Sequence, residues 1–171
     1  LNLALDVLDL YGDSREVSDA FCKALPESVD EYYADRVVGV LEGFAGAGHP
    51  TAVETLRKFL RDPQDAVADR ALRAFVAAAT SGAVPELEDL LRSTTGEHRR
   101  RGVEGAYALW LVSEKDAPLK ARLAGLLETF VMGEKDDAIA TRARAYHLVM
   151  SGQTRPVAPD VRKYIPSRAV G

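Results

Sequence analysis

The chain has 171 residues, of which 47% are hydrophobic and 28% are charged, and its formal net charge is −4. This length and composition suffice to bury the core of one folded domain and exclude a disordered chain. Residues 1–35 carry nine acidic and two basic side chains, a net charge of −7 that leaves +3 for the rest, which argues against a uniformly basic nucleic-acid-binding protein.

Helix start signals in the first part of the chain predict a helical hairpin near residues 14–46. Asp13 with Glu16, and Ser28 with Glu31, have the three-residue spacing of capping boxes, in which the first side chain accepts a hydrogen bond from the helix start. Each pair therefore marks the beginning of one helix of this hairpin.

A second hairpin is predicted near residues 50–80. Thr51 and Glu54 repeat the capping-box spacing directly after a proline. The pair Asp62-Pro63 cannot continue a helix, so we expect the turn between the two helices there.

The second half of the chain continues the same pattern. A hairpin near 83–112 is expected to turn at Ser93 to Gly96, and one near 117–150 is expected to break at Gly133. A short terminal helix is expected over 156–165. No segment alternates apolar and polar residues as a half-buried strand does, so the sequence predicts an all-α fold.

The hairpins are internal repeats. The triplet Ala68-Asp69-Arg70 repeats Ala34-Asp35-Arg36, and Arg101 and Arg142 fit the same frame. Val53 precedes Arg70, and Val84 precedes Arg101, by 17 residues, which gives a repeat of 31 residues.

The central repeats resemble the HEAT-like repeats, particularly the short form first described in the phycobilisome-lyase families. The resemblance is carried by His49-Pro50-Thr51-Ala52-Val53 leading to Leu56, Phe59 and Leu60, then Asp62-Pro63, then Asp65-Ala66-Val67 leading to Ala71 and Phe75. It covers roughly residues 14–165 and implies a right-handed α-α superhelix of about four hairpins, in a single domain over residues 1–171. The arginine common in the second helix of such units is replaced here by Ala68 or Ala140, with an arginine two places later.

The arginines of the repeat frame lie beside the apolar stripe of each second helix, and in such superhelices the second helices line the concave face. Two interpretations stay open: a basic rail that binds an acidic peptide or a phosphate backbone, and an internal ladder of ion pairs with acids at helix starts such as Asp30, Asp65 and Asp137. We favour the ladder because partly buried arginines are usually paired. The candidate binding residues of the concave face are Arg36, Arg70, Arg73, Arg100, Arg101, Tyr107, Trp110 and Arg142.

Three features bear on catalysis and location. The histidines His49, His98 and His147 fall in different repeats without the spacing of a metal site, so we expect no metal and no other cofactor. The lone Cys22 cannot form an internal disulfide and is expected to be a buried, inert thiol, which favours the cytoplasm. No apolar stretch approaches the ~20 residues that span a bilayer, so no membrane association is expected.

The sequence therefore predicts a scaffold or adaptor module that binds a protein or peptide partner and is not an enzyme. The first alternative is nucleic-acid binding, including the activity of HEAT-like DNA glycosylases, for which Trp110, Tyr107 and the arginines are the residues to test. A further alternative is a bilin-lyase-type assembly factor. Because the chain begins at Leu1 and not at Met, we expect it to be a fragment of a longer protein.

Overall fold

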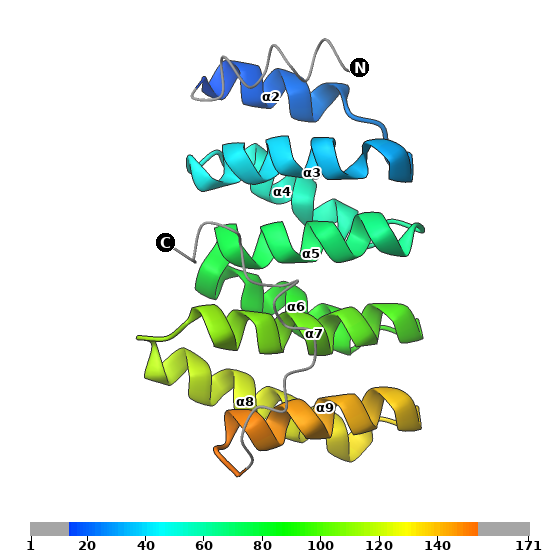
Figure 1. The fold of residues 1–171 in the computed structure, drawn as a ribbon, viewed down its shortest axis with the longest axis vertical. Coiled ribbons are helices and arrows are strands. Elements are labelled where there is room, and N and C mark those ends of the chain that lie inside the picture. The colour runs from blue at the N-terminus through cyan, green and yellow to red at the C-terminus, as the bar shows by residue number, and fades with distance from the viewer. Residues whose placement is uncertain (1–13, 154–171) are drawn as a thin grey trace. The chain divides into compact units, whose positions relative to one another are not determined.

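The structure is a computed structural model and describes residues 14–153. All regular secondary structure in this range is helical (Figure 1). The helices follow one another as hairpins, which confirms the predicted all-α helical repeat fold. The terminal helix expected over 156–165 lies outside the described residues, and the single domain over 1–171 stays a prediction.

The helices form two compact units that divide between Ala79 and Thr80. The first unit contains α2 (Arg15–Ala24), α3 (Glu31–Gly46), α4 (Pro50–Phe59) and α5 (Asp65–Ala79). The second contains the 3-10 helix η1 (Thr80–Ala83), α6 (Val84–Leu91), α7 (Gly96–Val112), α8 (Ala117–Gly133) and α9 (Asp137–Met150). These bounds agree within a few residues with the helices that prolines, glycines and apolar spacing predict.

The helix starts differ from the predicted capping boxes. The N-cap of α3 is Asp30, whose carboxylate accepts the Tyr32 N–H at 2.8 Å, and not Ser28. The N-cap of α4 is His49, which makes no side-chain cap hydrogen bond, so the capping role predicted for Thr51 was also wrong. Pro50 occupies the first helical position, where its fixed φ and its missing N–H both suit a helix start. Asp13 lies outside the described residues, and Ser14 caps α2.

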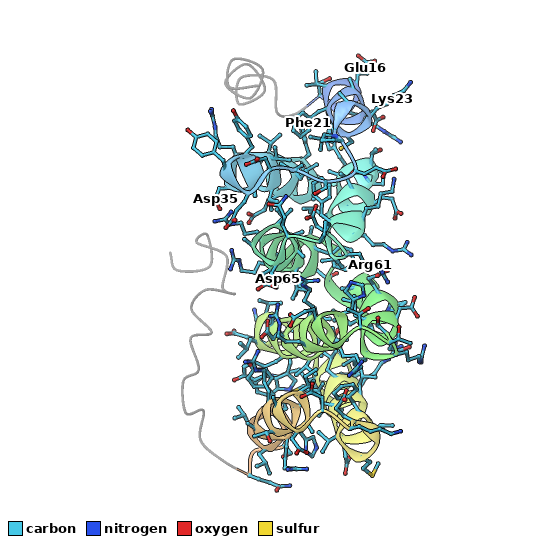
Figure 2. The ribbon with its side chains drawn as sticks, turned by 90° about the vertical axis from the view of Figure 1, so that its right-hand side faces the viewer. Glu16, Phe21, Lys23, Asp35, Arg61 and Asp65 are labelled. Atoms are coloured by element: carbon cyan, nitrogen blue, oxygen red, sulfur yellow. The ribbon has the colours of Figure 1, made fainter. Side chains whose placement is uncertain are left out.

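Within each unit the first helices of the hairpins form one layer and the second helices form the other. In the first unit α3 and α5 pack against each other and both contact α4. Asp35, on α3, lies on the second-helix side, whereas Lys23, on α2, lies on the first-helix side (Figure 2). The apolar side chains between the layers are fully buried, and in the first unit these include Leu41, Phe44, Leu56, Leu60, Leu72 and Phe75.

A single glutamine fixes the hairpin turn of the first unit. The Gln64 side chain donates to the Val29 carbonyl at 2.9 Å and accepts from the Glu31 N–H at 3.0 Å. The Asp62 carboxylate accepts the Gln64 N–H at 2.8 Å, so the turn itself is held in shape. These bonds tie the α4–α5 turn to the start of α3.

The second unit is built around α7. This helix packs against α6, α8 and α9, and every residue from Arg101 to Leu109 is buried. At Gly102 the backbones of α6 and α7 approach so closely that a Cβ atom would lie 2.9 Å from the backbone nitrogen of Leu91. Only glycine fits this crossing without displacement of α6.

Candidate functional site

The second-helix layer of the first unit carries an ion pair between neighbouring repeats. The Nε atom of Arg70, on α5, lies 2.5 Å from Oδ1 of Asp35, on α3. The Arg70 side chain is 26% exposed and that of Asp35 is 72% exposed. In the same layer Arg36 is exposed and Arg73 is half-buried.

The second unit has a charge network in the equivalent layer. Glu104, on α7, is 4% exposed and lies between two arginines. Its carboxylate pairs with Nη1 of Arg100 at 2.8 Å and also with Arg142, on α9. Arg100 reaches back to Glu97 at 2.7 Å as well. The network thus joins two second helices through one nearly buried carboxylate.

These contacts bear on the two interpretations of the arginine column. Arg70 and Arg142 are paired, as the ladder interpretation requires, but their partners Asp35 and Glu104 do not lie at helix starts, where we expected them. The acids that bind them lie in the preceding second helix, because neighbouring second helices pack side by side and bring their flanks into contact. A basic rail would instead need guanidinium groups that are not neutralised by carboxylates.

Two of the candidate residues lie inside the fold. Arg101 is 2% exposed and Tyr107 is 1% exposed. Burial raises the pKa of the Tyr107 phenol, whose oxygen has no hydrogen-bond partner among the described residues. In the part of the chain that the structure describes, neither side chain is available to a molecule at the surface.

Trp110, a candidate residue of the concave face, belongs to an aromatic stack and is half-buried. Tyr107 stacks on Tyr146 with ring centroids 4.2 Å apart and an interplanar angle of 6°. Trp110 continues the stack at 6.1 Å from Tyr107, and the Lys120 ammonium lies 3.8 Å from the Trp110 ring centroid. The indole is therefore held between a phenol and a cation.

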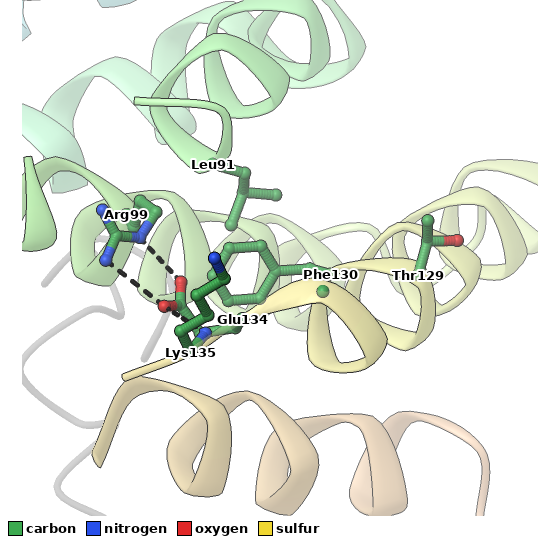
Figure 3. Close-up of a pocket in the computed structure, with 7 residues that line it drawn as sticks. Leu91, Arg99, Thr129, Phe130, Glu134 and Lys135 are labelled. Carbon is green, nitrogen blue, oxygen red and sulfur yellow. Dashed lines mark hydrogen bonds and ion pairs between the residues drawn. The ribbon is translucent and has the colours of Figure 1, made fainter. Parts of the chain in front are cut away.

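A further ion pair joins α7 to the C-terminal end of α8. Nε and Nη2 of Arg99 lie 2.7 and 3.2 Å from the two carboxylate oxygens of Glu134 (Figure 3). The third nitrogen, Nη1, donates to the carbonyls of Ser93 and Thr94 at 3.1 and 3.0 Å. The two partners are 35 residues apart, so no local pattern reveals this pair.

The Arg99–Glu134 pair has a defined electrostatic balance. Burial raises the pKa of the Glu134 carboxyl, but hydrogen bonds from Arg99 and from the N–H groups of Asp136 and Lys135 outweigh it and hold that pKa below its usual value. A cavity of about 380 Å³ lies beside the pair, with Leu91 and Phe130 among its walls. Because every nitrogen of the guanidinium is engaged, we interpret the pair as a structural clamp.

The remaining candidate groups have structural partners too. His49 is 8% exposed and stacks on Phe44 at 5.7 Å, and Nδ1 of His98 lies 3.1 Å from the Ser93 hydroxyl. Cys22 is half-buried, less than predicted, and burial raises the pKa of its thiol.

Across residues 14–153 no three His, Cys, Asp or Glu side chains gather as a metal site would require. No helix in this range has the length and apolar character needed to cross a membrane.

Comparison with known proteins identifies the repeats. A family model for HEAT repeats matches residues 18–108, which is more than half of the chain and spans most of α2 through most of α7. No curated protein and no solved structure matches. HEAT repeats generally mediate protein–protein interaction. The finer resemblance to the phycobilisome-lyase form stays a prediction. With the hairpins, the repeat frame and this match in agreement, the chain belongs to the HEAT-repeat family.

Proposed function

We propose that this chain is a protein-interaction module, acting as a scaffold or adaptor that binds a protein or peptide through its second-helix layer. The observation that carries the proposal is Tyr32, at the start of α3, whose ring is 79% exposed. Tyrosine and arginine are enriched among the residues that dominate binding energy, so an exposed tyrosine ring on this layer is a candidate contact for a partner.

The surroundings of Tyr32 support a protein partner. The Tyr33 ring packs edge-on against the Tyr32 ring, with the two ring centroids 5.0 Å apart. This contact restricts the position of the Tyr32 ring before any partner binds. Asp35 and Arg36 follow one helical turn later, and both are exposed. An exposed aromatic ring beside charges of both signs is typical of a protein-binding surface.

The contacts of the other candidate residues count against nucleic acid as the partner. Carboxylates neutralise Arg70, Arg100 and Arg142, so the positive field that a phosphate backbone needs is reduced. Trp110 is enclosed by Tyr107 and Lys120 instead of offering a face for a base.

Site-specific photo-crosslinking tests the proposal. A photoreactive phenylalanine analogue would replace Tyr32, and a matched control would carry it at Lys58, which is exposed on α4 in the first-helix layer. We expect one protein to crosslink at position 32 in cell extract and not at position 58. With that protein purified, Tyr32→Ala should weaken its affinity by about tenfold or more, whereas Lys58→Ala should leave it unchanged.

Three outcomes would refute the proposal. Equal crosslinking at both positions, or an affinity that Tyr32→Ala leaves unaltered, would remove the second-helix layer from consideration. Tight, strongly salt-dependent binding of a labelled 20-base-pair DNA by the unmodified chain would favour the nucleic-acid alternative instead.

A further inference from the structure

A groove lies at the edge of the second unit, where α7 ends and α8 begins. Its volume is about 930 Å³, and its walls come from η1, the last turn of α7, the α7–α8 loop and the first turn of α8. In Figure 1 this loop projects beyond the C-terminal end of α7. The groove shares no lining residue with the Arg99–Glu134 cavity, and all its residues belong to the second unit, whereas Tyr32 belongs to the first.

The floor of the groove is apolar. Leu111 is half-buried and Leu119 is 9% exposed, and both line the groove, whereas Leu109 is fully buried and offers a ligand no accessible area. Val112 is 40% exposed, one of the most exposed large hydrophobic side chains among residues 14–153. An aliphatic chain laid along Leu111, Val112 and Leu119 would remove apolar area from water on both sides.

The mouth of the groove is electronegative. Ser113 ends α7 by donating both its N–H and its hydroxyl to the Leu109 carbonyl, at 3.0 and 2.7 Å. The negative end of the α7 dipole therefore lies at the groove wall, where Val112 and Ser113 line it. Glu114 and Asp116, both exposed, add two carboxylates to the same wall.

The Asp116 carboxylate has capacity for a ligand. Its Oδ1 atom accepts the Leu119 N–H at 2.9 Å and so caps α8, a bond that uses one of its two oxygens. A guanidinium fork bridging Asp116 and Glu114 would add charge-assisted hydrogen bonds without breaking the cap.

We propose that this groove binds an arginine side chain presented by a segment of the protein partner. The methylenes of arginine fit the floor formed by Leu111, Val112 and Leu119, and its planar guanidinium fits the two carboxylates and the helix C-terminus. An acidic or phosphorylated segment would meet like charge at the mouth. A purely apolar segment would leave both carboxylates without a partner from the ligand.

Two further features of the groove agree with this assignment. Thr80, in its wall, has φ of 47°, a left-handed conformation that is costly for a residue other than glycine and often found at binding sites. Lys115 lies between the two acids in sequence and also lines the groove, so its positive charge opposes the binding of a second cation there.

The inference deepens the proposed function, but its test does not depend on Tyr32 or on knowing the partner. The probe is the dipeptide acetyl-Leu-Arg-amide, titrated into the ¹⁵N-labelled full chain and followed by amide chemical shifts. We expect shifts at Val112, Ser113 and Glu114 with a Kd on the order of 1 mM. The citrulline analogue, which has the same shape without charge, should bind at least about fivefold more weakly.

Variants separate a specific site from general charge attraction. Glu114→Gln and Asp116→Asn should each weaken the probe about threefold to fivefold, and asparagine still caps α8. Glu128→Gln, an exposed acid of α8 outside the groove, should change nothing. Lys115→Met should tighten binding about twofold to threefold because the opposing positive charge is removed.

Several results would overturn the proposal. These are equal affinity for arginine and citrulline, shifts that map elsewhere, and a loss of affinity in Lys115→Met. Without probe, groove shifts that depend on protein concentration would assign the groove to a second copy of the chain. Groove shifts on replacing Arg155, Arg162 or Arg168 would assign it to the chain's own C-terminal residues.

Discussion

Replacing Gly102 by alanine should destabilise the second unit, although alanine is the better helix former. A Cβ atom at this position would lie 2.9 Å from both the backbone nitrogen and Cγ of Leu91, and 3.0 Å from its Cδ2. The backbone nitrogen belongs to α6 and cannot rotate away, so the two helices must separate. Any separation also loosens the contacts of the fully buried Leu87 and Leu90.

The expected magnitude is the difference between two terms. Alanine gains about 1 kcal/mol of helix propensity over glycine. Overpacking a rigid contact costs typically about 1–3 kcal/mol and more when backbone is involved, and the distance to the Leu91 nitrogen puts Gly102 at the upper end. We therefore expect Gly102→Ala to lower the free energy of unfolding by about 2 kcal/mol.

Gly125, on α8 of the same unit, is the matched control. It is exposed and a Cβ atom there would meet nothing within 4 Å, so Gly125→Ala should raise stability by about 0.5–1 kcal/mol. Urea unfolding followed by the fluorescence of Trp110, the only tryptophan of the chain, reports on this unit. If Gly102→Ala proved as stable as the unmodified chain while Gly125→Ala behaved as expected, the close approach of α6 and α7 would be refuted.

Three other predictions follow from the ion pairs and the backbone. Arg70→Ala should lower the free energy of unfolding by at most about 1 kcal/mol, because its partner Asp35 is 72% exposed. Unfolding followed by circular dichroism measures this change, and a loss above about 3 kcal/mol would contradict the prediction. The pKa of Glu134 is lowered by folding, so its stabilisation is present above its unfolded pKa of about 4.3 and lost as pH falls through the folded pKa. The urea midpoint of Glu134→Gln should therefore fall less steeply between pH 7 and pH 3 than that of the unmodified chain. An equal pH dependence of the two midpoints would contradict the Arg99–Glu134 clamp. Thr80→Gly should raise the stability measured by thermal unfolding by about 0.5 kcal/mol, because glycine adopts a positive φ without strain. The control Ser81→Gly, which relieves no positive φ, should lower the stability. Stability changes of the same sign in both variants would contradict strain at Thr80.

Local signals in the sequence determined where the helices begin and end. Each of these signals affects only the residues within about one helical turn of it. Examples are Pro50 at the first position of α4, Pro63 in the α4–α5 turn and the break after Gly133. The spacing of apolar residues then selects the face that each helix buries, because residues three and four apart share a face in any α-helix. These rules do not depend on which other helices a helix packs against. The all-α class and the repeat could therefore be predicted from the sequence alone.

Tertiary structure decided which side chains meet. Glu104 binds Arg142, 38 residues away, because the packing of α9 on α7 sets the register of the two flanks. The same packing encloses Tyr107 under Tyr146, so this candidate residue of the concave face lies in the core. Nothing in the local sequence requires glycine at position 102; the requirement comes from the close approach of Leu91, on α6, to this position. Periodicity fixes the face of a helix, but the rotation and offset between two helices depend on many side chains packing at once. These set the Glu104–Arg142 and Arg99–Glu134 pairs and the Tyr107–Tyr146 stack.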